Sequence, residues 1–195
     1  MIAATALVLM MTLPGLALFY AGMVRKKSLL GTMAQSVAAT AIVSILWYAL
    51  GYSLAFTGDG AVIGSAARIF GAGIRLDTVS PFAKTIPEML FLAYQMTFAV
   101  ITVALVGGSV ADRLSFSAFV IFSVIWLFLV YVPSAHWVWG GGFLAQMGVI
   151  DFAGGTVVHI NAGVAGLVAA VVVGNRMGFG RANLAPVALP MAVPG

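Results

Sequence analysis

Long uninterrupted runs of apolar residues, separated by short polar segments, dominate the pattern of this chain. Five such runs occupy approximately residues 1–24, 29–57, 86–110, 116–137 and 152–174. Each is long enough for an α-helix to cross the hydrocarbon core of a bilayer, which takes about 20 residues. Barrel strands would instead alternate apolar and polar residues over about 10 positions. The pattern therefore predicts an all-α fold, a polytopic membrane helical bundle.

Composition supports a membrane protein. The chain is 63% hydrophobic and only 7% charged, whereas soluble domains carry roughly 25% charged residues. It contains no cysteine, which excludes disulfides and thiolate metal sites. The net charge of +4 comes from residues in the loops, where membrane topology explains it, so no nucleic-acid binding is indicated. We expect no metal and no other cofactor.

A sixth apolar stretch begins near Leu184 and reaches Gly195. It is too short to cross a membrane and contains three prolines, Pro186, Pro190 and Pro194. We therefore expect residues 1–195 to form a single membrane domain that is cut off inside or just before a sixth helix.

Basic residues predict the orientation of the spans. Those that follow runs one, three and five are Arg25, Lys26, Lys27, Arg113, Arg176 and Arg181. Because basic loops stay in the cytoplasm, the amino terminus is expected outside. The long loop from Gly58 to Thr85 then also lies outside, and its composition suggests irregular structure that includes a short helix. Five spans is an odd number, so a second copy would run in the opposite direction, as in the inverted repeats of transporters.

His159 lies inside the fifth run, where an ionisable side chain is expensive and marks a substrate or proton pathway by default. Gly155, His159 and Gly163 are spaced by four, so one helix face should carry all three and bring another helix close. We expect His159 to point into the bundle. The alternatives are a buried histidine bonded to a neighbouring helix, or a haem ligand, for which His136 is the only other histidine.

Asp151 directly precedes the fifth run. Aspartate is favoured as a helix cap, and the positive end of the helix dipole stabilises its charge. A compatible functional role is to keep the outer mouth of a pathway negative for a cation.

Aromatic residues gather at the expected outer ends of runs three and four. Trp139 precedes a glycine run that would let its ring cover a cavity mouth, and a tryptophan face attracts cations. The other interpretation is an ordinary interfacial aromatic belt. Tyr94 and Phe98, with Leu105 further along, fall at helical spacing on run three. They either pack the core or line a pore, with Phe98 as a gate and Leu105 in a dry wall.

Four strings together resemble the ammonium transporter, methylammonium permease and Rhesus protein family, and its bacterial ammonium transporter branch most. They are TALVLMMTLPGLALFYAGMVRKKS, FAVITVALVGGSVADR, YVPSAHWVWGGG and DFAGGTVVHINAGVAGLV. The resemblance implies an eleven-helix fold with two inverted five-helix halves, of which this chain is the first. It also implies a homotrimer in the bacterial inner membrane with one pore per subunit, and no enzymatic activity.

The resemblance also implies residue roles. It places a cation-recruiting tryptophan at Trp139, the outer gate phenylalanine at Phe98 and an aromatic above that gate at Tyr94. Asp151 matches a structural aspartate beside the outer site, and His159 the first of two paired pore histidines. The recruiting serine, the second gate phenylalanine and the second pore histidine belong to the other half of the family's fold.

The implied function is transmembrane transport of ammonium, with methylammonium as an analogue. Dehydrating a cation in an apolar pore is costly. Ammonium, unlike potassium, can lose a proton and proceed past His159 as neutral ammonia. The alternative within the family is an ammonium sensor that signals to a cytoplasmic partner; a haem-binding subunit is a further rival. The family's PII-type regulatory protein could dock on the loop Asn175 to Asn183, whose basic residues otherwise serve as topology anchors.

Overall fold

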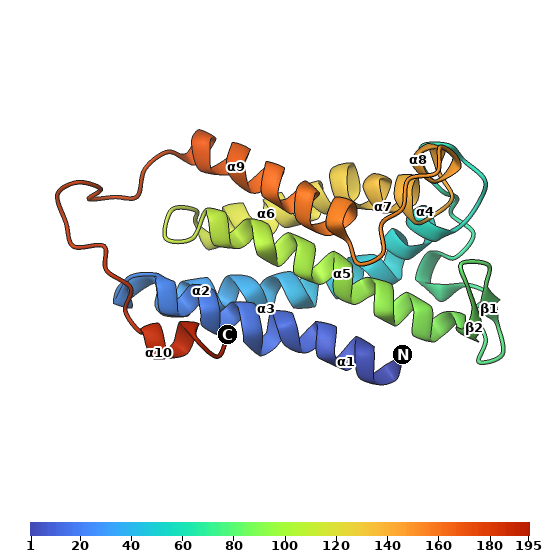
Figure 1. The fold of residues 1–195 in the computed structure, drawn as a ribbon, viewed down its shortest axis with the longest axis horizontal. Coiled ribbons are helices and arrows are strands. Elements are labelled where there is room, and N and C mark those ends of the chain that lie inside the picture. Colours follow the sequence, from blue (N-terminus) through green and yellow to red (C-terminus); the bar gives the residue numbers. More distant parts are fainter.

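The computed structural model describes all residues from 1 to 195, and five long apolar helices form its body (Figure 1). These helical segments are Ile2–Met23, Lys26–Phe56, Glu88–Ser109, Phe116–Gln146 and Gly155–Val173. All five are long and apolar enough to cross a membrane. The prediction of a helical membrane bundle from the hydrophobic runs is confirmed.

Most of these segments contain a change of helical geometry. The first comprises α1 (Ile2–Met10), a π-helical turn (Met11–Leu16) and α2 (Ala17–Met23). Leu13 has an extended backbone there, with φ −128° and ψ 110°. The residue before a proline is disfavoured in the α conformation, so Pro14 accounts for the break.

The remaining elements follow in chain order. The second segment begins with a 3₁₀ turn (Lys26–Ser28) and continues as α3 (Leu29–Leu46), a π-helical turn (Trp47–Gly51) and α4 (Tyr52–Phe56). The third segment is the single helix α5 (Glu88–Ser109). The fourth contains α6 (Phe116–Trp126), a π-helical turn (Leu127–Tyr131), α7 (Val132–Val138) and, after a glycine turn, α8 (Phe143–Gln146). The fifth is a π-helical turn (Gly155–Ile160) followed by α9 (Asn161–Val173).

Helix α5 is the centre of the molecule and packs against both α3 and α9. Small buried residues such as Ala99 of α5 and Ala39 of α3 let helices approach closely. Near the end of the bundle that carries α4, Trp47 is fully buried and donates its indole N–H to the Leu92 carbonyl at 3.2 Å. Its ring meets Tyr131 edge to face at a centroid distance of 6.0 Å. This packing positions α5, which carries Tyr94, Phe98 and Leu105.

The loop between α4 and α5 is more ordered than the sequence predicted. It contains a 3₁₀ turn (Ile69–Gly71) and an antiparallel hairpin of β1 (Val79–Ser80) and β2 (Ala83–Pro87). The short helix that the sequence suggested corresponds to the 3₁₀ turn, whereas the hairpin was not predicted. Strand β1 has only two residues, and β2, with the sequence AKTIP, does not alternate apolar and polar positions, so neither gives a strand pattern.

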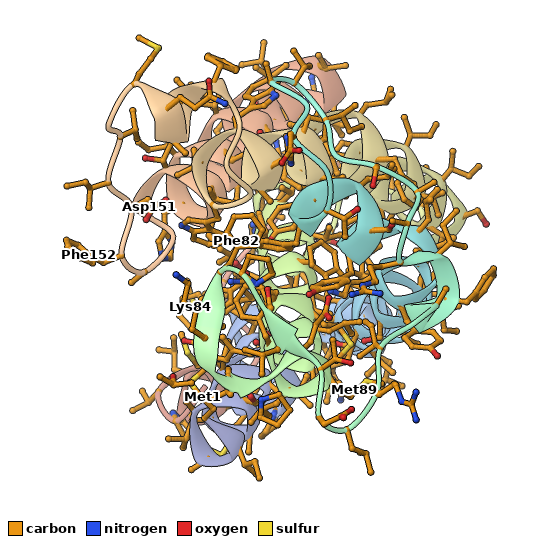
Figure 2. All side chains as sticks on the ribbon, turned by 90° about the vertical axis from the view of Figure 1, so that its right-hand side faces the viewer. Met1, Phe82, Lys84, Met89, Asp151 and Phe152 are labelled. Atoms are coloured by element: carbon orange, nitrogen blue, oxygen red, sulfur yellow. The ribbon has the colours of Figure 1, made fainter.

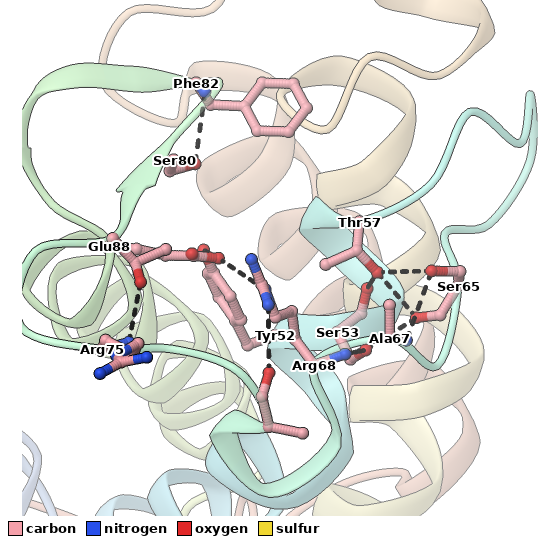
Figure 3. A network of polar contacts seen from close by, with 12 residues as sticks. Tyr52, Ser53, Thr57, Ser65, Ala67, Arg68, Arg75, Ser80, Phe82 and Glu88 are labelled. Atoms are coloured by element: carbon pink, nitrogen blue, oxygen red, sulfur yellow. Dashed lines mark hydrogen bonds and ion pairs between the residues drawn. The ribbon is translucent and has the colours of Figure 1, made fainter.

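Buried polar contacts fasten this loop to the bundle (Figure 3). Glu88, the first residue of α5, is only 3% exposed, and its Oε1 accepts a hydrogen bond from the Tyr52 hydroxyl at 3.0 Å. The Arg68 guanidinium lies 3.3 Å from the same oxygen. Because a buried carboxylate is costly unless paired, this network favours one position of the loop.

The end of the chain returns to the first segment. Short helix α10 (Leu189–Ala192) packs against α2, and the backbone N–H of Ala188 donates to the Gly22 carbonyl at 3.2 Å. A Cβ at Gly22 would lie 2.7 Å from the Ala188 oxygen, so this approach requires glycine. The sixth apolar stretch therefore lies alongside the first span.

The two ends of the bundle differ in character. The hairpin, α8 and the amino terminus gather at one end, whereas the loops with the six basic residues named above gather at the other (Figure 1). We refer to these as the hairpin end and the basic end.

Candidate functional site

An aromatic hollow lies at the hairpin end of the bundle and has a volume of about 240 Å³. Figure 2 looks onto this end, with Phe82 on the hairpin and Asp151 on the loop that precedes the fifth segment. The hollow is lined by Phe56, Phe82, Phe91, Tyr94, Gln95, Phe98, Trp139, Asp151 and Phe152. All four residues that the sequence predicted for an outer site are therefore in one place.

Three of these aromatic rings form a continuous chain of edge-to-face contacts. The ring centroids of Tyr94 and Phe98, four residues apart on α5, are 5.0 Å apart at 87°. Phe98 meets Trp139 at 5.7 Å and 69°. Such pairs stabilise one another when the edge of one ring meets the face of the next. Trp139 is fixed further because its Nε1–H donates to the Asp151 backbone oxygen at 2.9 Å.

The Asp151 carboxylate is saturated by the start of the fifth helical segment. Its Oδ1 accepts from the backbone N–H of Gly154 and Gly155 at 2.7 and 2.8 Å, and its Oδ2 from Thr156 and Val157, both at 2.9 Å. The first N–H groups of a helix have no partner within it, and here one carboxylate serves four. The predicted cap is thus observed, and direct binding of a cation to this carboxylate would break hydrogen bonds.

His159 lines a second hollow, of about 350 Å³, between α5 and the fifth segment. Leu105 and Ser109 contribute the α5 side of this hollow. Leu105 follows Phe98 by seven residues, which is about 10 Å along the same helix face. One face of α5 therefore connects the aromatic hollow to the His159 hollow.

The expected placement of His159 inside the bundle is not met within these five helices. Its side chain is exposed, and a Cβ at Gly163 would have no atom within 4 Å. The π-helical turn Gly155–Ile160 also alters the spacing on which the shared face was predicted. The glycine that does allow close packing is Gly166, where a Cβ would lie 2.9 Å from Ser109 Oγ. Within these five helices, the glycine face predicted from Gly155 and Gly163 has no helix packed against it.

The sequence model described as the Ammonium Transporter Family matches residues 1–195. This chain belongs to the ammonium transporter family. An ammonium transporter of Bacillus subtilis is 51% identical over 171 residues, covering 88% of this chain and 42% of that protein. An ammonium transporter of Aquifex aeolicus is 50% identical over 181 residues, covering 90% of this chain and 41% of that protein. The family consists of transporters rather than enzymes.

Solved structures agree with this assignment. The crystal structure of Candida albicans Mep2 matches with a TM-score of 0.84 and 32% identity, over 98% of this chain and 43% of that one. A structure titled Sensor Amt Protein matches with a TM-score of 0.86 and 26% identity, over 98% of this chain and 49% of that one. The chain thus spans less than half the length of the relatives that it matches.

His136, the second histidine considered for a haem site, has a structural role in this chain. It is fully buried in α7, with Nδ1 2.8 Å from the Ala55 oxygen and Nε2 2.6 Å from the Gly60 oxygen. Both ring nitrogens are therefore occupied by backbone carbonyls of α4 and the loop after it. His136 clamps α7 to that loop and is not available as an axial ligand.

At the basic end, Arg113 joins the two helices that form the His159 hollow. Its guanidinium donates to the Ser109 carbonyl of α5 and to the carbonyls of Ala170 and Gly174, at 3.4 and 2.7 Å. Cations are stabilised at helix C-termini, where carbonyls lack partners. Sequence analysis treated Arg113 only as a topology signal and missed this contact.

A second charged contact closes the same end. Arg25 Nε lies 2.5 Å from Asp112 Oδ2, and Ser28 also donates to this carboxylate. Burial alone would raise the pKa of Asp112, but the hydrogen bonds from Arg25 and Ser28 and nearby arginine charge together lower it. The lowered pKa means that folding favours the charged carboxylate. The contact therefore stabilises the fold at pH values above the ordinary pKa of an aspartate, and this stabilisation is lost as the pH falls through the lowered pKa.

Proposed function

We propose that this chain forms the outer recruitment site and one wall of the conduction path of a transmembrane ammonium transporter. The observation that carries the proposal is the shared face of α5, with the Tyr94–Phe98–Trp139 hollow at one level and the Leu105–His159 hollow below it. The named transporters at about half sequence identity support ammonium as the substrate.

The proposed route begins with attraction of ammonium to the aromatic faces. Cation–π attraction contributes roughly 0.5–2 kcal/mol and is strongest for tryptophan when water is excluded. The cation then meets Phe98, whose ring contacts Trp139 and acts as a gate. Beyond this gate the wall offered by Leu105 is apolar, and a charged species would lose its hydration without compensation.

Transfer of one proton from ammonium to water at the outer mouth leaves neutral ammonia, which does not meet this electrostatic barrier. Neutral ammonia crosses the second hollow, where His159 provides a ring nitrogen as a hydrogen-bond partner. Potassium has no proton to lose, so the same wall excludes it. This step accounts for selectivity between two cations of similar size.

We further propose that residues of the full-length protein outside this chain cover the exposed His159 face. Support comes from the open space around Gly163 and from the length of the relatives, which this chain covers by less than half. By resemblance to the family, this other half carries the second pore histidine. The complete protein would then be an eleven-helix homotrimer in the bacterial inner membrane, with the amino terminus outside.

The test of this function uses the full-length protein in proteoliposomes. His159→Ala should lower methylammonium uptake about tenfold or more, which corresponds to about 1.4 kcal/mol or more in the barrier. His136→Gln serves as a control, because His136 lies outside the proposed path. Any fall in its uptake should be explained by a matching loss of protein stability. Unchanged rate and ion selectivity in His159→Ala would contradict the proposed path.

The same measurement separates transport from sensing. The similarity to the solved Sensor Amt Protein concerns the fold, which both roles share. A wild-type protein that binds ammonium but shows no flux in proteoliposomes would favour the sensor.

A further inference from the structure

The aromatic hollow is lined by a buried glutamine whose amide oxygen has no hydrogen-bond partner within the chain. Gln95 lies on α5 beside Tyr94, lines the hollow and is only 9% exposed. Its oxygen Oε1 is buried and has no hydrogen-bond partner. An unpaired buried acceptor costs about 1–3 kcal/mol, so it calls for an explanation such as a bound water, an ion or a role in function.

The other polar side chains of the hollow are mostly occupied. Five of the nine lining residues are phenylalanines. Trp139 has only an N–H to offer, and it donates this group to the Asp151 backbone. The Asp151 carboxylate accepts four backbone N–H groups. The Gln95 amide and the Tyr94 hydroxyl therefore remain as the side-chain groups that can accept a hydrogen bond from a ligand.

We propose that Gln95 accepts a hydrogen bond from an N–H group of ammonium in the aromatic hollow and selects cations that carry such groups. The assignment rests on the proposed transport function. Aromatic faces attract monovalent cations without regard to N–H groups, whereas an amide oxygen requires a donor within about 3 Å.

The geometry of the hollow fits this role. A volume of about 240 Å³ accommodates ammonium with several waters, because a water molecule takes about 30 Å³. The terminal torsion of glutamine is broad, and a half-turn exchanges oxygen and nitrogen at nearly constant shape. Gln95 lines the hollow together with Tyr94 and Phe98, and such a half-turn exchanges which of its two amide atoms is enclosed.

The experiment compares two cations on the full-length transporter in proteoliposomes. Methylammonium carries three N–H groups, whereas tetramethylammonium has none and is tested as an inhibitor of methylammonium uptake. Gln95→Met keeps the side-chain length but loses the amide acceptor. It should raise the half-saturation concentration for methylammonium about tenfold, and change inhibition by tetramethylammonium by less than about twofold. Gln95→Glu keeps an acceptor and should retain tight half-saturation.

Two controls separate this role from packing. Met96→Leu changes the neighbouring residue of α5, which does not line the hollow, and should leave both cations unaffected. Thermal stability of Gln95→Met should equal or exceed that of the wild type, because it removes an unpaired polar group from a buried position.

Three results would count against the assignment. These are a half-saturation concentration within about twofold of wild type in Gln95→Met, equal weakening of both cations, or a loss of stability that explains the kinetic change. A wild-type protein without any uptake would instead contradict the proposed function itself, and with it the ligand assigned to Gln95.

Discussion

Trp139 brings two different groups to the aromatic hollow. Its ring face is available to a cation, and its edge meets Phe98, whereas its N–H is committed to the Asp151 backbone. The family motif indicated the ring at this position. The motif does not indicate the N–H contact, because this contact joins Trp139 to a residue beyond the next turn and α8.

Substitution of Trp139 tests the two groups separately. Trp139→Leu in the full-length protein removes both and should raise the half-saturation concentration for methylammonium about tenfold, because roughly 0.5–2 kcal/mol of cation–π attraction is lost. Trp139→Phe keeps an aromatic face without the N–H and should show a smaller effect in the same uptake measurement. Size-exclusion chromatography should find the same oligomer for all three proteins. Loss of the assembly in Trp139→Leu would assign Trp139 to packing instead.

At the scale of elements, α5 and α9 form the wall of the proposed path, and their spacing determines its width. Gly166 allows their contact, because a Cβ there would lie 2.9 Å from Ser109 Oγ and 3.1 Å from Ser109 Cβ. Arg113 ties the ends of the same two helices together through their free carbonyls. The sequence predicted both helices, but not which of many glycines and alanines separates them.

Gly166→Ala should therefore destabilise the full-length protein by about 1–3 kcal/mol, since extra volume in a tight contact forces the backbone apart. The measurement is thermal unfolding of the detergent-solubilised protein. Gly31→Ala in α3 is the matched control, because a Cβ there meets no atom within 4 Å. It should be neutral or slightly stabilising, as alanine favours a helix over glycine. Equal shifts for both variants would show that the contact with Ser109 is unimportant.

At the scale of the whole molecule, charge divides the bundle into two unlike ends. The basic end is held together by Arg25 and Asp112, and the Arg25 guanidinium also donates to the Met177 carbonyl at 3.1 Å. This contact links the loop after the first span to the segment 175–183. That segment presents Arg181 to solvent, and we propose that a PII-type regulatory protein docks there.

Charge reversal tests this docking surface on the full-length transporter. Arg176→Glu with Arg181→Glu should weaken binding of a trimeric PII protein about tenfold or more, because like charges across an interface are repulsive. Arg75→Glu with Lys84→Glu makes the same charge change at the hairpin end, and binding should be retained. Isothermal titration or co-purification measures both. Full binding to the first variant would leave the arginines as topology anchors.

The sequence by itself determined the class of the protein, the five membrane-length helices and the family. These follow from local properties: run length, low charge and strings that specify particular turns and helix ends. The aspartate cap was predictable for the same reason, since Asp151 and the N–H groups that it accepts are within six residues.

Only the tertiary structure decided which residues lie across from one another. The unpaired amide of Gln95, the contact of Gly166 with Ser109, the clamp at His136 and the open face of His159 each depend on helices that are distant in sequence. The π-helical turn at Gly155–Ile160 adds to this, because a small change in periodicity rotates every side chain that follows. Such features arise from packing of several elements at once, and hydrophobic periodicity along one helix contains no information about them.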